Sequence, residues 1–167
     1  MIRAAALAAC LLPGSAVAQE GCTPLGADFS FCPEGTGWDG VPVETPEMGL
    51  SLTSGTVTLT SQAVEVPEDP SPEELRLTVT DMAERLIGDD LAAFRPILED
   101  RPKTGTGLAL RVAFVAGSLD EPFVFALTIV STGVGVALIQ TRAAGDYLDE
   151  THSALHLDAI AALGVRP

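Results

Sequence analysis

Three apolar segments between residues 107 and 141 constrain the fold most, because only short turns separate them. They read "GLALRVAFVAG", "PFVFALTIV" and "GVGVALIQT". The first alternates apolar residues with others, whereas the second and third are almost continuously apolar, which is typical of central strands covered on both faces. Connections as short as "GSLDEP" and "STG" leave no room for a crossover, so we expect the three strands to be antiparallel neighbours.

Two other segments carry a helical repeat and could cover such a sheet. In "SPEELRLTVTDMAERLIG", Ser71 is a suitable N-cap, Pro72 fits the first helical position, and Glu74 completes a capping box. Its apolar stripe is Leu75, Val79, Met82, Leu86 and Ile87. The segment "GDYLDETHSALHLDAIAALG" predicts a second helix with Asp146 as its cap and Gly164 at its end. Its stripe is Leu148, His152, Leu155, Ala159 and Leu163. The helices could lie one on each face, or both on one face.

The remaining strands are short. The segment "LSLTSGTVTLT" predicts a hairpin that turns at its Ser-Gly pair, with Leu50 and Leu52 facing Val57 and Leu59. The segment "AVEV" predicts another short strand, and "DDLAAF" a short helical turn. The expected fold class is therefore α+β, an antiparallel sheet of about five to six strands packed with two amphipathic helices.

The first residues resemble an export signal. Arg3 precedes an apolar run, a Pro-Gly pair and the small-residue sequence "AVA", which predicts a signal peptide over residues 1–18 that is cleaved after Ala18. The apolar run is too short to span a membrane, so no span is expected after cleavage. The sequence "LAAC", ending at Cys10, resembles a lipobox, but cutting there would leave too short an apolar region.

The rest of the chain divides into two parts by composition. Residues 19–46 are rich in Gly and Pro and lack periodicity, which predicts an irregular segment held to the core by Phe29, Phe31 or Trp38. Residues 47–167 contain the predicted strands and helices and form the expected α+β domain.

The charge balance excludes some partners. The chain has 23 acidic and 9 basic residues, with a net charge of −14, and Lys103 is its one lysine. Nucleic acids and anionic lipid surfaces need clustered cations, so we expect neither as a partner. The acidity is typical of a solvated surface that keeps an exported protein soluble.

Cys22 and Cys32 could form a redox centre, part of a metal site or a disulfide. Redox centres normally use C-x-x-C at the start of a helix, whereas nine residues separate these two cysteines. A structural zinc site needs four ligands, and the chain after Ala18 has only two cysteines. An even cysteine count in an exported protein predicts a disulfide, so Cys22 and Cys32 should form a loop of the amino-terminal segment.

Asp149, His152 and His156 are the candidate metal ligands. Offsets of three and four residues place them on one helix face, and H-x-x-x-H can supply two ligands to Zn²⁺ or Cu²⁺. His152 also belongs to the apolar stripe, so both histidines could instead be structural. The sequence marks no third ligand from elsewhere, has no G-x-S-x-G elbow, and lacks a dinucleotide or phosphate loop. We therefore assign no catalytic residue and expect no cofactor.

The order of elements resembles the PsbP/DcrB-like fold of small exported bacterial proteins. The resemblance runs from about Trp38 to Leu163. It rests on a tryptophan followed by P-x-x-G, the helix opening "SPEEL" and the ending "GVALIQTRAAGDYLDETHSALHLDAIAAL". It implies an antiparallel sheet flanked by helices and accessory, stabilising or partner-binding roles. The cysteine pair is outside this resemblance.

The sequence thus predicts an exported, non-catalytic accessory or binding protein of the bacterial periplasm. Its partner, a protein or a small molecule, is not identified. The alternative is a metal-assisted hydrolase that uses His152, His156 and a third ligand.

Overall fold

The computed structural model has two antiparallel sheets and two helices, so the predicted α+β class is confirmed. It describes residues 21–47, 49–64, 70–87, 95–105, 107–118, 120–133 and 135–166.

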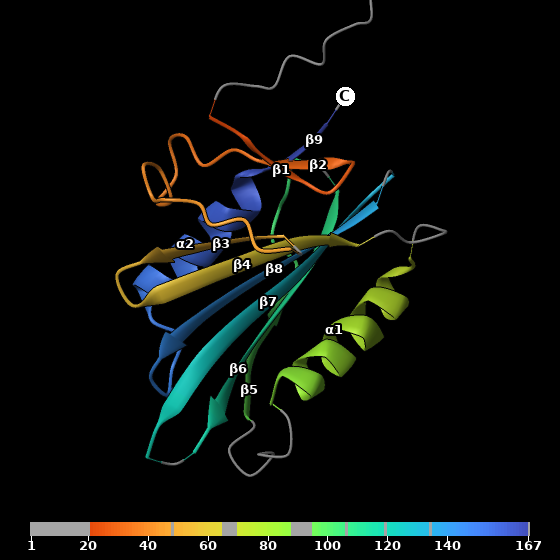
Figure 1. Ribbon diagram of the computed structural model, residues 1–167. Helices are drawn as coiled ribbons and strands as arrows, with labels where there is room; N and C mark the ends of the chain where they lie inside the picture. The colour runs from red at the N-terminus through yellow and green to blue at the C-terminus, as the bar shows by residue number, and fades with distance from the viewer. Residues whose placement is uncertain are drawn as a thin grey trace, which may run out of the picture.

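The larger sheet has six strands in the order β3-β4-β8-β7-β6-β5, and every neighbouring pair is antiparallel (Figure 1). Its strands are β3 (Leu50–Ser54), β4 (Val57–Val64), β5 (Arg95–Asp100), β6 (Leu108–Gly117), β7 (Pro122–Thr132) and β8 (Gly135–Ala144). The three predicted long strands are β6, β7 and β8, and they are sequential neighbours, as their short connections require.

The predicted hairpin is β3–β4, but its turn lies one residue further along than expected. Ser54 pairs with Val57, so the two-residue loop is Gly55-Thr56 and not Ser54-Gly55. Gly55 has a φ of 58°, and a two-residue hairpin loop favours glycine at such a position. As a result Leu52 faces Leu59, whereas Leu50 faces Ser61.

Two further differences concern strand boundaries. The predicted separate strand "AVEV" begins as the end of β4, and its last two residues lie outside the described residues, as does "DDLAAF". Strand β5 was not predicted, and it contains Pro96, a residue that central strands exclude. Proline is tolerated in an edge strand, which β5 is, and the register shifts between Pro96 and Leu98.

Helix α1 (Pro72–Ile87) packs on β6 and β7. The predicted capping box is confirmed: the Ser71 N–H donates to Glu74 Oε2 at 2.7 Å, and the Glu74 N–H donates to Ser71 Oγ at 3.3 Å. The stripe positions whose side chains are described are buried or half-buried, namely Leu75, Val79 and Met82. They join a core cluster with Leu110, Phe114, Phe125 and Leu127.

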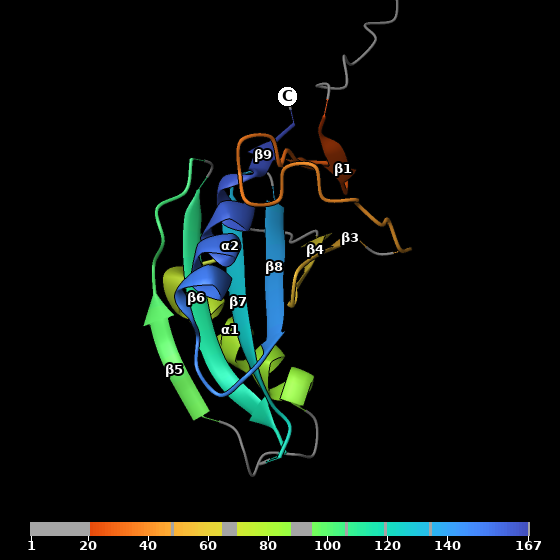
Figure 2. The same cartoon turned by 90° about the vertical axis from the view of Figure 1, so that its left-hand side faces the viewer.

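Helix α2 (Glu150–Ala161) packs on the opposite face, over β8, β7 and β4, so the structure has one helix on each face (Figure 2). The predicted cap at Asp146 is wrong. Asp149 has extended backbone, and its side chain accepts the His152 N–H at 2.8 Å, so Asp149 is the N-cap. The helix also ends before the predicted Gly164, because Leu163–Val165 form strand β9.

Strand β9 belongs to a second sheet, of order β1-β2-β9, at one end of the molecule (Figure 1). Its other strands are β1 (Thr23–Leu25) and β2 (Phe29–Phe31). The prediction that residues 19–46 are irregular is therefore wrong for β1 and β2. Strands of three residues are too short to show a period in the sequence. Their order comes instead from pairing with β9, at the far end of the chain.

The predicted Cys22–Cys32 disulfide is confirmed, with the two Cα atoms 4.2 Å apart. It closes the β1–β2 hairpin, in which Thr23 faces Phe31. The predicted anchors are also confirmed, since Phe29, Phe31 and Trp38 are all buried. Trp38 Nε1 donates to the Leu155 carbonyl of α2 at 2.7 Å, which fixes the disulfide segment to that helix.

Candidate functional site

The predicted metal ligands His152 and His156 are residues of α2 whose rings face the sheet, and each residue is at most 1% exposed. Thr141 of β8 is the centre of their contacts: its Oγ1 lies 2.8 Å from His152 Nε2 and 2.8 Å from His156 Nδ1. On the other side of the second ring, Thr128 Oγ1 of β7 lies 2.7 Å from His156 Nε2. The two imidazoles therefore bond to threonine hydroxyls of the sheet.

This environment keeps the rings neutral. Burial lowers the pKa of His156 to about 3, with Arg111 and His152 acting in the same direction. Burial also lowers the pKa of His152, although the Asp149 carboxylate opposes that shift. A neutral imidazole has one donor and one acceptor, and His156 uses both.

The third candidate, Asp149, does not join the two rings as a ligand set. Its Oδ1 accepts a backbone N–H as the helix cap. Among the described residues, no group of three or more His, Cys, Asp or Glu side chains is arranged to hold a metal ion. The geometry therefore gives the metal-assisted hydrolase no support.

Arg111 extends the buried polar set beside the histidines. Its guanidinium bonds to Asp100 of β5 at 2.8 Å through Nε and at 2.6 Å through Nη2. Its Nη1 is the one buried side-chain nitrogen or oxygen without a hydrogen-bond partner in the part of the chain that the structure describes. Apart from this atom, the buried side-chain nitrogens and oxygens of the described residues are thus hydrogen-bonded.

The opposite face contains a feature that the sequence analysis did not predict. There α1 covers β6 and β7, whereas the neighbouring β4 and β8 carry polar side chains. Directly paired residues of antiparallel strands share a face, and Thr58 pairs with Arg142 and Thr60 with Gln140. All four of these side chains are exposed or half-buried.

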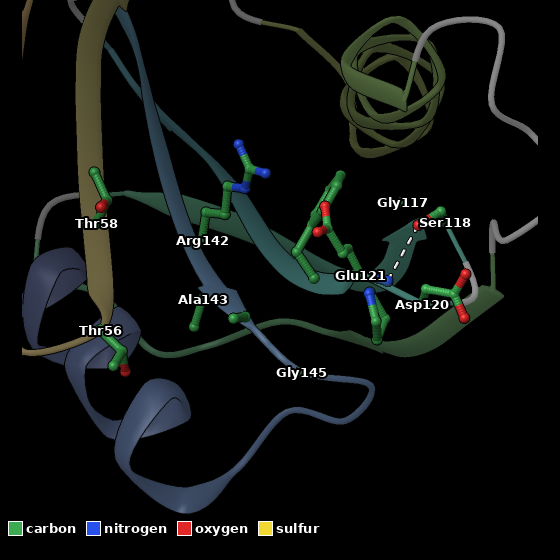
Figure 3. Close-up of a pocket in the computed structure, with 12 residues that line it drawn as sticks. Thr56, Thr58, Gly117, Ser118, Asp120, Glu121, Arg142, Ala143 and Gly145 are labelled. Atoms are coloured by element: carbon green, nitrogen blue, oxygen red, sulfur yellow. Dashed lines mark hydrogen bonds between the residues drawn. The ribbon is translucent and has the colours of Figure 1, made fainter.

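A cavity of about 920 Å³ lies at the end of this polar surface (Figure 3). Its walls come from the start of β4, the β6–β7 connection and the end of β8. Its lining includes Thr58, Gly117, Asp120, Glu121, Phe123 and Arg142. We call this cavity the Arg142 pocket.

Aromatic rings hold Arg142 in place. Its guanidinium carbon lies 4.1 Å from the centre of the Phe123 ring and 5.6 Å from that of Phe125. Phe123 meets Phe125 edge to face, with centroids 5.0 Å apart, and Phe125 contacts Phe114 at 5.5 Å. The guanidinium therefore rests on a ring stack that continues into the core beneath α1.

The turn between β6 and β7 makes room for this stack. A Cβ atom at Gly117 would lie 2.6 Å from the Glu121 carbonyl oxygen and 2.8 Å from a carbon of the Phe123 ring. Gly117 also has a φ of 93°. Glycine is required at this position both by the backbone and by the ring on which Arg142 rests.

Arg142 has no carboxylate partner among the described residues, although the chain has 23 acidic residues. The acidic residues of the pocket, Asp120 and Glu121, form no ion pair with it. Figure 3 shows Arg142 and Glu121 directed toward the same side of the sheet. The pocket thus combines an unneutralised cation with nearby unneutralised carboxylates.

The sequence offered one signal for this site. Polar residues alternate with Val57 and Leu59 along β4, which indicates one solvated strand face. Nothing local in "LIQTRAAG" marks Arg142, because its partner Phe123 belongs to another strand.

Within the described residues, no helix has the length and apolar character that a membrane crossing requires.

No protein-family model and no curated protein matches the sequence. Solved structures do match. A protein from Bacteroides thetaiotaomicron VPI-5482 aligns with a TM-score of 0.53 and 15% identity over 83% of this chain, which spans 45% of that protein. A mutant of the protein Mog1 aligns with a TM-score of 0.51 and 10% identity, over 83% of this chain and 90% of Mog1.

LpqN, a protein involved in cell envelope biogenesis of Mycobacterium tuberculosis, aligns with a TM-score of 0.46 and 16% identity, over 86% of this chain and 82% of LpqN. That score is too low to support an inference. At such identities the Bacteroides and Mog1 matches show the fold alone. The structural neighbours of this chain include proteins of the Mog1/PsbP-like fold, consistent with the PsbP/DcrB-like resemblance of its sequence.

Proposed function

We propose that this protein is an exported, non-catalytic binding protein that holds a ligand in the Arg142 pocket. One observation carries the proposal: Arg142 rests on Phe123 without a carboxylate partner among the described residues. In a chain of net charge −14, a surface arginine can readily find an internal partner. An arginine held by a ring and left unpaired is suited to bind a ligand from outside.

The histidines support binding in preference to acid–base catalysis. His152 and His156 lie on the α2 side of the sheet, where threonines of β7 and β8 occupy three of their ring nitrogens. The Arg142 pocket lies on the α1 side. Neither imidazole can therefore exchange a proton with a ligand in the pocket without rearrangement of the sheet.

Export to the periplasm is part of the same proposal. The disulfide supports an extracytoplasmic location, because such bonds persist in oxidising compartments. We propose that residues 1–18 are a signal peptide cleaved after Ala18. Residues 19–46 and the α+β domain of residues 47–167 would then form the mature protein. Mass spectrometry of the secreted protein should find Gln19 at its amino terminus, and an uncleaved chain would contradict this part.

The binding proposal is tested by NMR titration of the mature protein with small charged and neutral compounds. We expect shifts of the amide signals of pocket-lining residues, namely Gly117, Ser118, Asp120, Glu121, Phe123 and Arg142–Gly145. Arg142→Gln should weaken the binding that these shifts report by about tenfold. Arg101→Gln is the matched control, because Arg101 is exposed and does not line this pocket. Absence of pocket shifts with every compound, or equal shifts in Arg142→Gln, would contradict the proposal.

A further inference from the structure

We infer that the ligand of the Arg142 pocket is a small zwitterion of the amino-acid type. Its carboxylate would bind Arg142, and its ammonium group would bind Glu121. This inference rests on the proposed function and specifies the ligand's chemistry.

The Arg142 end of the pocket selects a carboxylate. The guanidinium carbon lies over the Phe123 ring, 4.1 Å from the ring centre, so the ring contacts the group from one side. The N–H groups lie in the plane of a guanidinium and point outward from its edge, where a carboxylate can accept two of them side by side. Thr58 pairs with Arg142 across β4 and β8 and lines the same pocket.

The β6–β7 connection supplies the opposite charge. Glu121 and its neighbour Asp120 are exposed, and neither forms an ion pair among the described residues. The Glu121 N–H donates to Ser118 Oγ at 3.1 Å, which ties the turn that carries both carboxylates. Glu121 lies on the same side of the sheet as Arg142 (Figure 3). An ammonium group is the ligand group that complements it.

The charge of the whole protein argues against purely anionic ligands. At a net charge of −14, the protein repels anions, and most strongly those with two or more charges, such as phosphate. A zwitterion carries no net charge, so it can approach without this repulsion and still present a carboxylate to Arg142. The same property distinguishes it from a simple carboxylate, whose charge would face Asp120 and Glu121 uncompensated.

The experiment uses a series of ω-amino carboxylates from glycine to 6-aminohexanoate, titrated into the mature protein by NMR. The chain length that binds best reports the separation of the two charged ends of the pocket. For that member, the matched probes are the carboxylate without the amine, the amine without the carboxylate, and inorganic phosphate. We expect the zwitterion to bind about tenfold more tightly than each of these, as a charge-assisted hydrogen bond allows.

Two variants assign the two ends. Arg142→Gln should weaken binding of the zwitterion about tenfold and leave binding of the simple amine unchanged. Glu121→Gln should remove the advantage of the zwitterion over the simple carboxylate. Arg101→Gln should leave all these affinities unchanged.

The outcomes separate this inference from the proposed function. Tighter Arg142-dependent binding of phosphate, a simple carboxylate or a neutral compound overturns the zwitterion and leaves the binding function standing. Absence of pocket shifts with every compound overturns both.

Discussion

The polar side chains on the two faces of the large sheet differ in burial and in their bonds within the protein. Beneath α2, His152 and His156 are buried, and Thr128 and Thr141 bond to their rings. On the α1 side, Arg142 reaches solvent and has no carboxylate partner among the described residues. The polar residues beneath α2 are therefore used to hold the fold, whereas Arg142 is held in place by Phe123 and stays available to the ligand that we propose.

The largest expected difference comes from the same substitution on each face. Thr141→Val leaves one nitrogen of each buried histidine without its partner, and two such losses should lower the free energy of unfolding by about 4 kcal/mol. Thr58→Val on β4 removes a half-buried hydroxyl whose one hydrogen bond among the described residues is with Thr53 Oγ1 at 3.5 Å, so it should cost less than about 0.5 kcal/mol. Urea unfolding measures both, and equal costs would break the comparison.

The next largest loss of stability should come from removal of the disulfide in the segment that bonds to α2. Cys22 and Cys32 are separated by 10 positions, and closing a loop of this size stabilises by about 3 kcal/mol in the chain-entropy model. Replacement of both cysteines by serine should lower stability by that amount and shift the signals of Trp38 and Leu155, which the segment joins. Signals of the Arg142 pocket should stay in place, and their loss would show that the two faces are coupled.

The pH dependence should come from the α2 face. The unfolded chain binds a proton on His156 with a pKa of about 6.5, whereas burial lowers the folded pKa to about 3. Protons therefore favour the unfolded state below about pH 6.5, and stability is lost as the pH falls toward 3. Between pH 7 and pH 5 the loss should be about 2 kcal/mol.

Urea unfolding at the two pH values measures this loss. His156→Gln should reduce the pH dependence by the contribution of His156 and keep that of His152, whereas Arg142→Gln, on the other face, should keep both. An NMR titration that gives His156 a pKa near 6.5 in the folded protein would contradict the prediction.

The sequence predicted the α+β class, α1 with its capping box, the three long strands and the disulfide, because each follows from a local pattern. It missed β5, where a proline concealed an edge strand, and the small sheet, which requires β2 to meet β9 from the far end of the chain. The site was missed for the same reason. Arg142 lies near the polar end of β8, and its proposed role depends on contact with Phe123 of β7. The two residues come together only in the folded sheet.

The smallest expected effect is the loss of Arg142 itself, and Arg111 provides its matched comparison. Arg111→Gln breaks a bidentate pair whose arginine side chain is 7% exposed and whose Asp100 partner is 38% exposed. Because solvent screens that partner and the substitution also removes the unbonded Nη1, we expect a cost of about 2 kcal/mol. Among the described residues, Arg142→Gln removes cation–π contacts with Phe123 and Phe125 and no ion pair, so stability should fall by about 0.5 kcal/mol or less.

Urea unfolding of the two variants, together with the NMR titration, decides between structure and function for each arginine. Arg111→Gln should lose stability and keep ligand binding, while Arg142→Gln should bind the zwitterion about tenfold more weakly and keep its stability. If Arg142→Gln instead destabilised the protein as much as Arg111→Gln, its stacking on Phe123 would be a structural contact. The polar side chains on the α1 face would then serve the fold, as those on the α2 face do.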